Sequence, residues 1–195
     1  MEDQVRRGAS RVGPRGVVLL TPSVITTYTG REFRPLRPRV GDVDIRVIAH
    51  SLSMICRFNG HVARFYSVAE HCVLVSLMVP PSDALAGLLH DAAEAYVADV
   101  STPVKRARGF AFYRRTEDRI LAAVLARFGL LPPLPWSVHC ADQRLVVEEA
   151  RRLFLSPPAW TDGLPGAPDA AIVGLPPEQA EVLYLDRFRE LFGCE

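Results

Sequence analysis

Apolar residues recur along much of the chain at intervals of three or four, the spacing that predicts amphipathic α-helices. Prolines, glycines and polar clusters separate these periodic stretches. The spacing predicts helices over residues 44–55, 67–78, 82–97, 112–128, 137–154 and 177–192. Residues 24–28 are rich in β-branched side chains and predict one short strand. We therefore expect an all-α fold with a short irregular or β-like N-terminal segment.

Local signals mark several ends of these predicted helices. Asp44 and Ser82 have side chains that favour the N-terminal cap position. Pro80-Pro81 should end the second helix, and Pro103 is expected to break the segment after the third. Residues 156–176 contain many prolines and glycines and show little periodicity, so they predict a long loop.

Composition places the chain among ordinary globular proteins. Of its 195 residues, 49% are hydrophobic and 23% are charged, and this length suits one domain with a sizeable core. The formal net charge of +1 provides no global basic field for a nucleic-acid polymer. Arginine and glycine crowd residues 1–18, which predicts a flexible basic tail ahead of a single domain at 19–195.

The sequence also carries information about the cellular compartment. Its first apolar run, at 17–20, is too short for a signal peptide or a membrane span. The cysteines, at 56, 72, 140 and 194, show no Cys-x-x-Cys spacing. Scattered free thiols predict a cytoplasmic protein and argue against zinc held by several thiolates. We expect Cys72 and Cys140, which lie close to the ligands proposed next, to be small buried residues.

The most informative polar residues are His90 and Asp91, which directly follow the apolar run 84–89. Burying such a pair costs free energy unless a partner compensates it, and a metal ion would bind both side chains. His71 lies in the second predicted helix, and Asp142 lies in the fifth. Together they offer two imidazoles and two carboxylates to one divalent cation.

Each of these residues also has a purely structural interpretation. A lone histidine on an apolar helix is more often a hydrogen-bonded core residue than a ligand, and Asp142 could stabilise the start of a helix. Glu94 and Asp99, taken singly, would be surface acids. Their combination favours a site. Asp91 and Glu94 are three residues apart and His90 and Glu94 are four apart, so all three can share one face of the same predicted helix.

Four stretches of the chain together resemble the HD-domain phosphohydrolase superfamily. They are Arg57-Phe58, Val68-Ala69-Glu70-His71, Leu89-His90-Asp91-Ala92-Ala93-Glu94, and Asp99 followed by Thr102-Pro103-Val104-Lys105. The likeness covers about residues 20–155. It is closest to small bacterial 5′-deoxynucleotidases, phage deoxynucleoside triphosphate hydrolases and the phosphohydrolase of oxetanocin biosynthesis. The resemblance implies that residues 19–195 form a single HD-domain helical bundle.

One divalent transition metal is implied by the resemblance, held by His71, His90, Asp91 and Asp142. Co²⁺, Mn²⁺, Fe²⁺, Ni²⁺ and Zn²⁺ suit this mixed set of ligands, and Mg²⁺ is also admitted. His139 is the one histidine that follows His90 in the sequence. It is either a further residue facing the site or a structural residue, and the structural role is favoured. The interval from His71 to His90 is shorter than in many such enzymes, so the helices beside Pro80-Pro81 should be joined tightly.

The same resemblance assigns roles around the ion. Glu94 is implied as the acid or base of the reaction, and Asp99 as a further catalytic residue that contacts the sugar. Arg57 and Lys105 are implied as phosphate-binding residues, although each could instead be a solvated surface cation. Phe58 stands where these enzymes often have a tryptophan beside the sugar.

The implied activity is metal-dependent removal of phosphate from nucleoside mono-, di- or triphosphates, deoxynucleotide-like or modified, including stepwise removal as in nucleoside-antibiotic biosynthesis. Two alternatives stay open: release of intact triphosphate from a deoxynucleoside triphosphate, and a non-catalytic nucleotide sensor on the same fold. A purely structural helical domain would bind no metal. The expected partner is a small nucleotide, without a nucleic-acid polymer or a membrane, and a homo-oligomer stays open.

Overall fold

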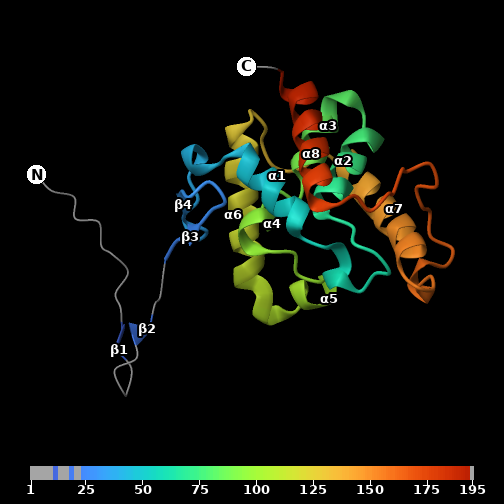
Figure 1. The fold of residues 1–195 in the computed structure, drawn as a ribbon, viewed down its shortest axis with the longest axis horizontal. Helices are drawn as coiled ribbons and strands as arrows, with labels where there is room; N and C mark the ends of the chain where they lie inside the picture. Colours follow the sequence, from blue (N-terminus) through green and yellow to red (C-terminus); the bar gives the residue numbers. More distant parts are fainter. Residues whose placement is uncertain (1–10, 13–17, 20–22, 194–195) are drawn as a thin grey trace, which may run out of the picture.

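The computed structural model describes residues 11–12, 18–19 and 23–193. Its α-helices are α1 (Ile45–Met54), α2 (Val68–Met78), α3 (Ala84–Leu89), α4 (Glu94–Val97), α5 (Thr102–Lys105), α6 (Ala111–Arg127), α7 (Trp136–Leu153) and α8 (Pro177–Phe192) (Figure 1). The predicted mostly helical fold is confirmed. Of the predicted tail at 1–18, only Arg11, Val12 and Val18 belong to the described residues, and Cys194 lies outside them.

Two short antiparallel hairpins precede the helices. Strand β1 (Arg11–Val12) pairs with β2 (Val18–Leu19), and β3 (Ile25–Thr26) pairs with β4 (Glu32–Phe33). The strand predicted over 24–28 is therefore confirmed only at its centre. Phe33 fixes the second hairpin to the helices, because its ring is fully buried and stacks on Tyr96 with 3.8 Å between ring centroids.

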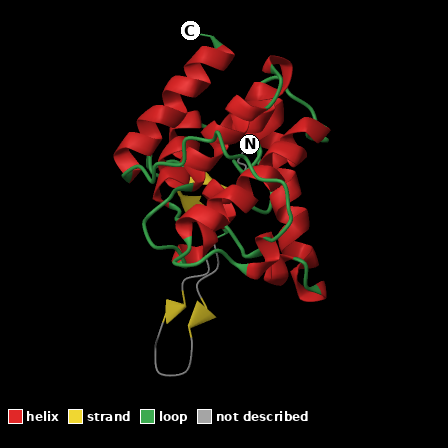
Figure 2. Ribbon diagram, turned by 90° about the vertical axis from the view of Figure 1, so that its right-hand side faces the viewer, coloured by secondary structure: helices red, strands yellow, loops and turns green. Residues whose placement is uncertain are grey.

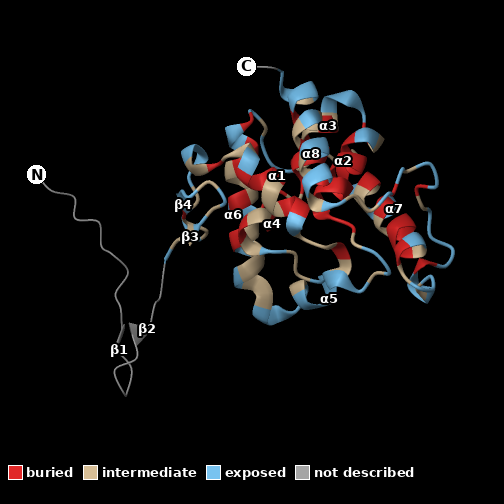
Figure 3. Cartoon of the chain, in the orientation of Figure 1, coloured by how far each residue is buried: buried red, intermediate tan, exposed pale blue. Residues whose placement is uncertain are grey.

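Helix α2 occupies the centre of the bundle. It packs against α1, α3, α7 and α8, and Figure 2 shows that helices make up most of the structure. All residues from 68 to 76 are buried (Figure 3). The sequence pattern predicted one buried face for this helix, but a helix surrounded by others is apolar all round. Ser67 caps it by accepting a hydrogen bond of 3.1 Å from the Glu70 N–H.

The continuous helix predicted over 82–97 is wrong. Helix α3 ends at Leu89, and residues 90–93 form tight turns with bonds to the third preceding residue, such as Glu94 N to Asp91 O at 2.9 Å. Nδ1 of His90 donates to the Gly87 carbonyl at 2.8 Å. In a continuous α-helix that carbonyl would accept the N–H of Asp91, so the histidine side chain competes with the helix.

Two predicted end signals also act differently from expectation. Ser82 does not cap α3: its hydroxyl donates to Asp83 at 3.1 Å, because a 3₁₀ turn over Pro81–Asp83 leads directly into the helix and its Pro81 carbonyl accepts the Ala84 N–H. Pro103 does not end a helix but lies in the first turn of α5. A proline is tolerated there because first-turn N–H groups have no helical partner.

The predicted loop at 156–176 contains no α-helix along its length, all of which the structure describes. Side chains of neighbouring helices nevertheless hold its backbone in place. Arg151 of α7 donates to the carbonyls of Thr161 and Leu164 at 2.6 and 2.7 Å. Glu70 of α2 is buried and accepts the N–H groups of Val173, Gly174 and Leu175 at 2.8, 3.1 and 2.7 Å. Five backbone groups of this irregular segment are thereby paired.

The helices that the structure describes include none that is both long enough and apolar enough to cross a lipid bilayer.

Candidate metal centre

Three segments bring the four predicted ligands together: α2, the turn at 90–93, and α7. Nε2 of His71 lies 3.2 Å from Oδ1 of Asp142 and 3.8 Å from Oδ2 of Asp91. Nε2 of His90 lies 3.2 Å from Oδ2 of Asp91 and 4.0 Å from Oδ1 of Asp142. Donor atoms bound at about 2.1 Å to one ion lie roughly 3–4 Å apart, so these separations fit a single cation.

Hydrogen bonds determine which nitrogen of each imidazole faces this cluster. Nδ1 of His71 donates to Oε1 of Glu149 at 2.6 Å, and Nδ1 of His90 donates to the Gly87 carbonyl at 2.8 Å. Both Nε2 atoms are buried and have no partner in hydrogen-bond geometry among the described residues. Leaving them so costs free energy. An ion between these nitrogens and the carboxylates would remove that cost, so the residues fit a metal.

The cluster is buried on its histidine side and partly open on its carboxylate side. The side chains of His71 and His90 are 0% and 6% exposed, whereas those of Asp91 and Asp142 are 22% and 34% exposed. An ion held by all four would therefore face solvent, or a bound molecule, past the two carboxylates.

The four ligands also shift one another's pKa. Burial and the charge of Arg57 would lower the pKa of His71, but Glu149 and Asp142 outweigh them and raise it. Burial opposes charge on His90 as well, and Asp91 raises its pKa. The two histidines in turn hold the pKa of Asp91 below its usual range against the effect of burial. The cluster without an ion thus retains protons that a cation would displace.

The sequence reasoning missed Glu149, which is completely buried. Besides His71, its carboxylate accepts from the Tyr66 hydroxyl at 2.7 Å and from Nη2 of Arg57 at 3.2 Å. Burial would raise its pKa, but the charges of His71 and Arg57 hold it at about 2. The sequence feature that could have identified Glu149 is its position seven residues after Asp142, which places both carboxylates on the same face of α7.

Arg57 lies at the edge of the cluster rather than in solvent. Its residue is 9% exposed, and Nη1 is 3.6 Å from Oδ2 of Asp91. The neighbouring Phe58 packs edge-on against Phe154, with ring centroids 5.2 Å apart. Phe58 has a φ of +53°, which costs free energy in a residue other than glycine and is typical of strained positions near sites.

Glu94 opens α4 and is 4% exposed, and its Oε2 has no hydrogen-bond partner among the described residues. Burial, then the charges of Asp91 and Asp99, raise its pKa to about 9. Nζ of Lys105 lies 3.9 Å from Oε1 of Glu94 but 2.6 Å from Oε1 of Glu117, an acid that the sequence reasoning did not select.

Asp99 follows α4 and is half-buried. The residue before it, Ala98, has φ +65° and ψ +162°, a region that residues other than glycine rarely occupy. Two bonds hold it there: its N–H donates to the Glu94 carbonyl at 2.8 Å, and its carbonyl accepts the Tyr113 hydroxyl at 2.6 Å. This strained turn places Asp99 close enough to Glu94 for its charge to raise the pKa of that acid.

His139 does not join the ligands. It is exposed on α7 beside Trp136, with ring centroids 6.1 Å apart. Cys72 is fully buried as predicted, whereas Cys140 is only half-buried.

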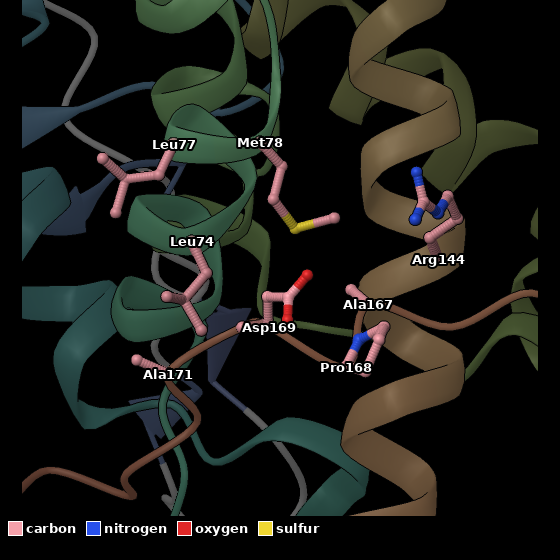
Figure 4. A pocket seen from close by; sticks show the side chains of 9 residues that line it. Leu74, Leu77, Met78, Arg144, Ala167, Pro168, Asp169 and Ala171 are labelled. Carbon is pink, nitrogen blue, oxygen red and sulfur yellow. The ribbon is translucent and has the colours of Figure 1, made fainter.

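Two hollows of the described structure lie away from this cluster. The first, of about 370 Å³, lies between α2 and α7 and is lined by Leu74, Leu77, Met78, Arg144 and residues 167–171 (Figure 4). The second, of about 340 Å³, separates the β3–β4 hairpin from α1. None of the four proposed ligands lines either hollow, so the metal centre is recognised from its donor atoms and not from a cavity.

A scan against protein-family models finds no match for the chain. The chain is 37% identical over 172 residues to the uncharacterized protein YfdR of Escherichia coli (strain K12), an alignment that covers 87% of this chain and 96% of YfdR. It is also 37% identical over 158 residues to the uncharacterized protein RCAP_rcc00048 of Rhodobacter capsulatus, which covers 74% of this chain and 80% of that relative. The chain therefore belongs to the same family as YfdR.

Proposed function

We propose that the chain is a divalent-metal-dependent phosphohydrolase that removes phosphate from nucleotides. One observation carries the proposal: two buried Nε2 atoms without hydrogen-bond partners among the described residues converge on Asp91 and Asp142. A buried acid, Glu94, lies on the following turn. The nucleotide class comes from the motifs that resemble HD-domain phosphohydrolases.

The metal would be held by His71, His90, Asp91 and Asp142. Their nitrogen and oxygen donors suit Co²⁺, Mn²⁺, Fe²⁺ or Ni²⁺, with Mg²⁺ admitted. When bound, such an ion polarises a phosphate oxygen and lowers the pKa of a water molecule. Nδ1 of His71 is bonded to Glu149 and Nδ1 of His90 to the Gly87 carbonyl, and these bonds fix the orientation of both rings. Both Nε2 atoms are therefore available to a metal ion without rotation of the rings.

Glu94 would transfer the proton. Its pKa of about 9 keeps the carboxyl protonated at neutral pH, which suits a general acid that protonates the leaving oxygen. A cation bound nearby favours the carboxylate and moves this pKa closer to neutrality. Nζ of Lys105, 3.9 Å from Oε1 of Glu94, acts in the same direction.

Arg57 and Lys105 would bind the phosphate. A phosphate oxygen beside Asp91 would lie within reach of the Arg57 guanidinium, whose Nε has no partner among the described residues. Lys105 is oriented by Glu117 at 2.6 Å and would contribute a compact positive charge. Asp99 would accept a hydrogen bond from a sugar hydroxyl, and the half-buried ring of Phe58 would pack beside the sugar.

A phosphate-release assay tests this proposal, using nucleoside mono-, di- and triphosphates with Co²⁺, Mn²⁺ or Mg²⁺. We expect turnover of at least one nucleotide and a loss of about 100-fold or more in kcat for Glu94→Gln. Glu178→Gln, at an exposed carboxylate in the first turn of α8, should leave kcat unchanged.

The products separate the alternatives. Inorganic phosphate indicates stepwise removal, and tripolyphosphate indicates the one-step reaction. Metal-loaded protein that turns over none of the nucleotides would overturn the proposal, and nucleotide binding without turnover would favour a sensor.

We also propose that the protein acts in the cytoplasm. Cys56, Cys72 and Cys140 are free within the part of the chain that the structure describes, and a reducing compartment maintains such thiols.

A further inference from the structure

Cys72 follows the ligand His71 on α2 and lies against the metal centre. Its Sγ, a ring nitrogen of His90 and a carboxylate oxygen of Asp91 all lie within 4.8 Å of one another. Because Nδ1 of His90 is bonded to the Gly87 carbonyl, the available nitrogen is Nε2. Two sets of donors therefore overlap at His90: one with His71 and Asp142, the other with Cys72 and Asp91.

We propose that Cys72, His90 and Asp91 form a second coordination mode, specific for thiophilic divalent ions such as Zn²⁺ and Cd²⁺. This inference rests on the metal centre proposed above and adds a ligand of a different chemical class to it. Thiolate sulfur selects soft ions, whereas imidazole and carboxylate donors also accept harder ones. The chain would thus distinguish two kinds of ion by whether the Cys72 thiolate takes part.

The distances allow this mode after a small side-chain movement. Zn²⁺ binds sulfur at about 2.3 Å and imidazole nitrogen at about 2.0 Å, so in tetrahedral coordination these two donors lie about 3.5 Å apart. The present separations are no greater than 4.8 Å. The donors would therefore have to approach one another by no more than about 1.3 Å.

Binding in this mode is an exchange of a proton for a metal ion. The S–H bond of Cys72 breaks, its proton passes to solvent, and a metal–sulfur bond forms without any change of oxidation state. His90 belongs to both donor sets, so one ion excludes the other. Zn²⁺ and Cd²⁺ should therefore displace Mn²⁺ and inhibit any activity that depends on it.

Other cysteines of the chain provide matched controls. Cys140 is two residues before the ligand Asp142, and Cys56 precedes Arg57, yet neither belongs to a group of donors among the described residues. If proximity along the sequence were sufficient, Cys140→Ser would weaken Cd²⁺ binding as much as Cys72→Ser. If the spatial group of donors is required, only Cys72→Ser will weaken Cd²⁺ binding.

Ultraviolet absorption of the whole protein titrated with Cd²⁺ tests the inference. We expect a thiolate-to-cadmium charge-transfer band in the native protein, in Cys56→Ser and in Cys140→Ser, but not in Cys72→Ser. The Cd²⁺ affinity of Cys72→Ser should fall by about tenfold or more, while its Mn²⁺ affinity stays within about twofold. Cys72→Ala serves as a second variant, and thermal unfolding shows that both remain folded.

Two results would overturn the inference: native protein that binds Mn²⁺ but shows no cadmium–thiolate band, or a band that persists in Cys72→Ser. Both are independent of catalysis. Absence of Mn²⁺ binding to the native protein would instead contradict the proposed metal centre, so the two failures are distinguishable.

Discussion

The carboxylate of Glu149 accepts a hydrogen bond of 2.6 Å from Nδ1 of His71, and both side chains are completely buried. The same carboxylate binds the guanidinium of Arg57, which borders Asp91. One buried acid thus connects a metal ligand to the arginine proposed to bind phosphate. Such a bond fixes the ring orientation of a ligand histidine and increases its basicity.

Replacing Glu149 should weaken the metal centre. Glu149→Gln removes the charge that supports both His71 and Arg57, and we expect the Mn²⁺ affinity to fall by about 10–100-fold. Isothermal titration measures it. The control is Glu148→Gln, because the adjacent Glu148 pairs with Arg152 at 2.7 Å, outside this network. Equal Mn²⁺ affinities for Glu149→Gln and the native protein would contradict the assignment of Glu149.

Metal affinity should decrease as the pH falls. The pKa values of His71 and His90 are both raised in the ion-free protein, so a cation must displace protons that bind more strongly at low pH. We expect about a tenfold loss of affinity per pH unit for each displaced proton. Mn²⁺ titrations between about pH 8 and about pH 5.5 measure this loss, and an affinity that is constant over this range would contradict the histidine ligands.

Glu94 should destabilise the ion-free protein at alkaline pH. Its pKa is about 9 in the folded chain and about 4.3 in an unfolded one. Between these two pH values the folded state therefore keeps a proton on Glu94 that the unfolded state releases. The stabilisation that this proton gives is fully present below about pH 4.3 and is lost as the pH rises through about 9. Glu94→Gln resembles the protonated acid and avoids this loss.

We expect Glu94→Gln to raise Tm by roughly 4–8 °C at about pH 9, which corresponds to about 2 kcal/mol, and to change it little at about pH 5. Thermal unfolding in the presence of a chelator measures both values. The same shift at both pH values would show that burial of the Glu94 charge is not the cause.

Gly174 should tolerate a side chain less well than Gly30. Both have left-handed backbones, with φ of +81° and +76°, but a Cβ on Gly174 would lie 2.7 Å from the Phe65 carbonyl, whereas no described atom lies within 4 Å of a Cβ on Gly30. Each alanine incurs a backbone cost of about 1–2 kcal/mol. Gly174→Ala also disturbs the N–H that Glu70 accepts at 3.1 Å.

We therefore expect urea unfolding to give a free energy of unfolding at least about 2 kcal/mol lower for Gly174→Ala than for Gly30→Ala. Equal losses would mean that the loop at 156–176 can move away from Phe65 without cost.

Helix periodicity was sufficient to predict α6, α7 and α8 to within one residue at each end, because turns, caps and apolar faces are local properties. The cap of α1 by Asp44 was predicted for the same reason, and its carboxylate accepts the Arg46 N–H at 3.0 Å. The predicted helix over 82–97 failed because its interruption depends on where the His90 side chain points, which periodicity does not contain.

The sequence by itself determined the mostly helical fold, the residue types His, His-Asp and Asp on separate segments, and the buried setting of His90. The tertiary structure decided which donor atoms lie close together and which side chains form hydrogen bonds or ion pairs with the residues of the site. Glu149 lies 78 residues from His71 along the chain, and Glu117 was brought to Lys105 by the packing of α5 on α6. Hydrogen-bond partners that are distant in sequence are chosen by how the helices pack, and the spacing of residues along one helix does not specify that packing.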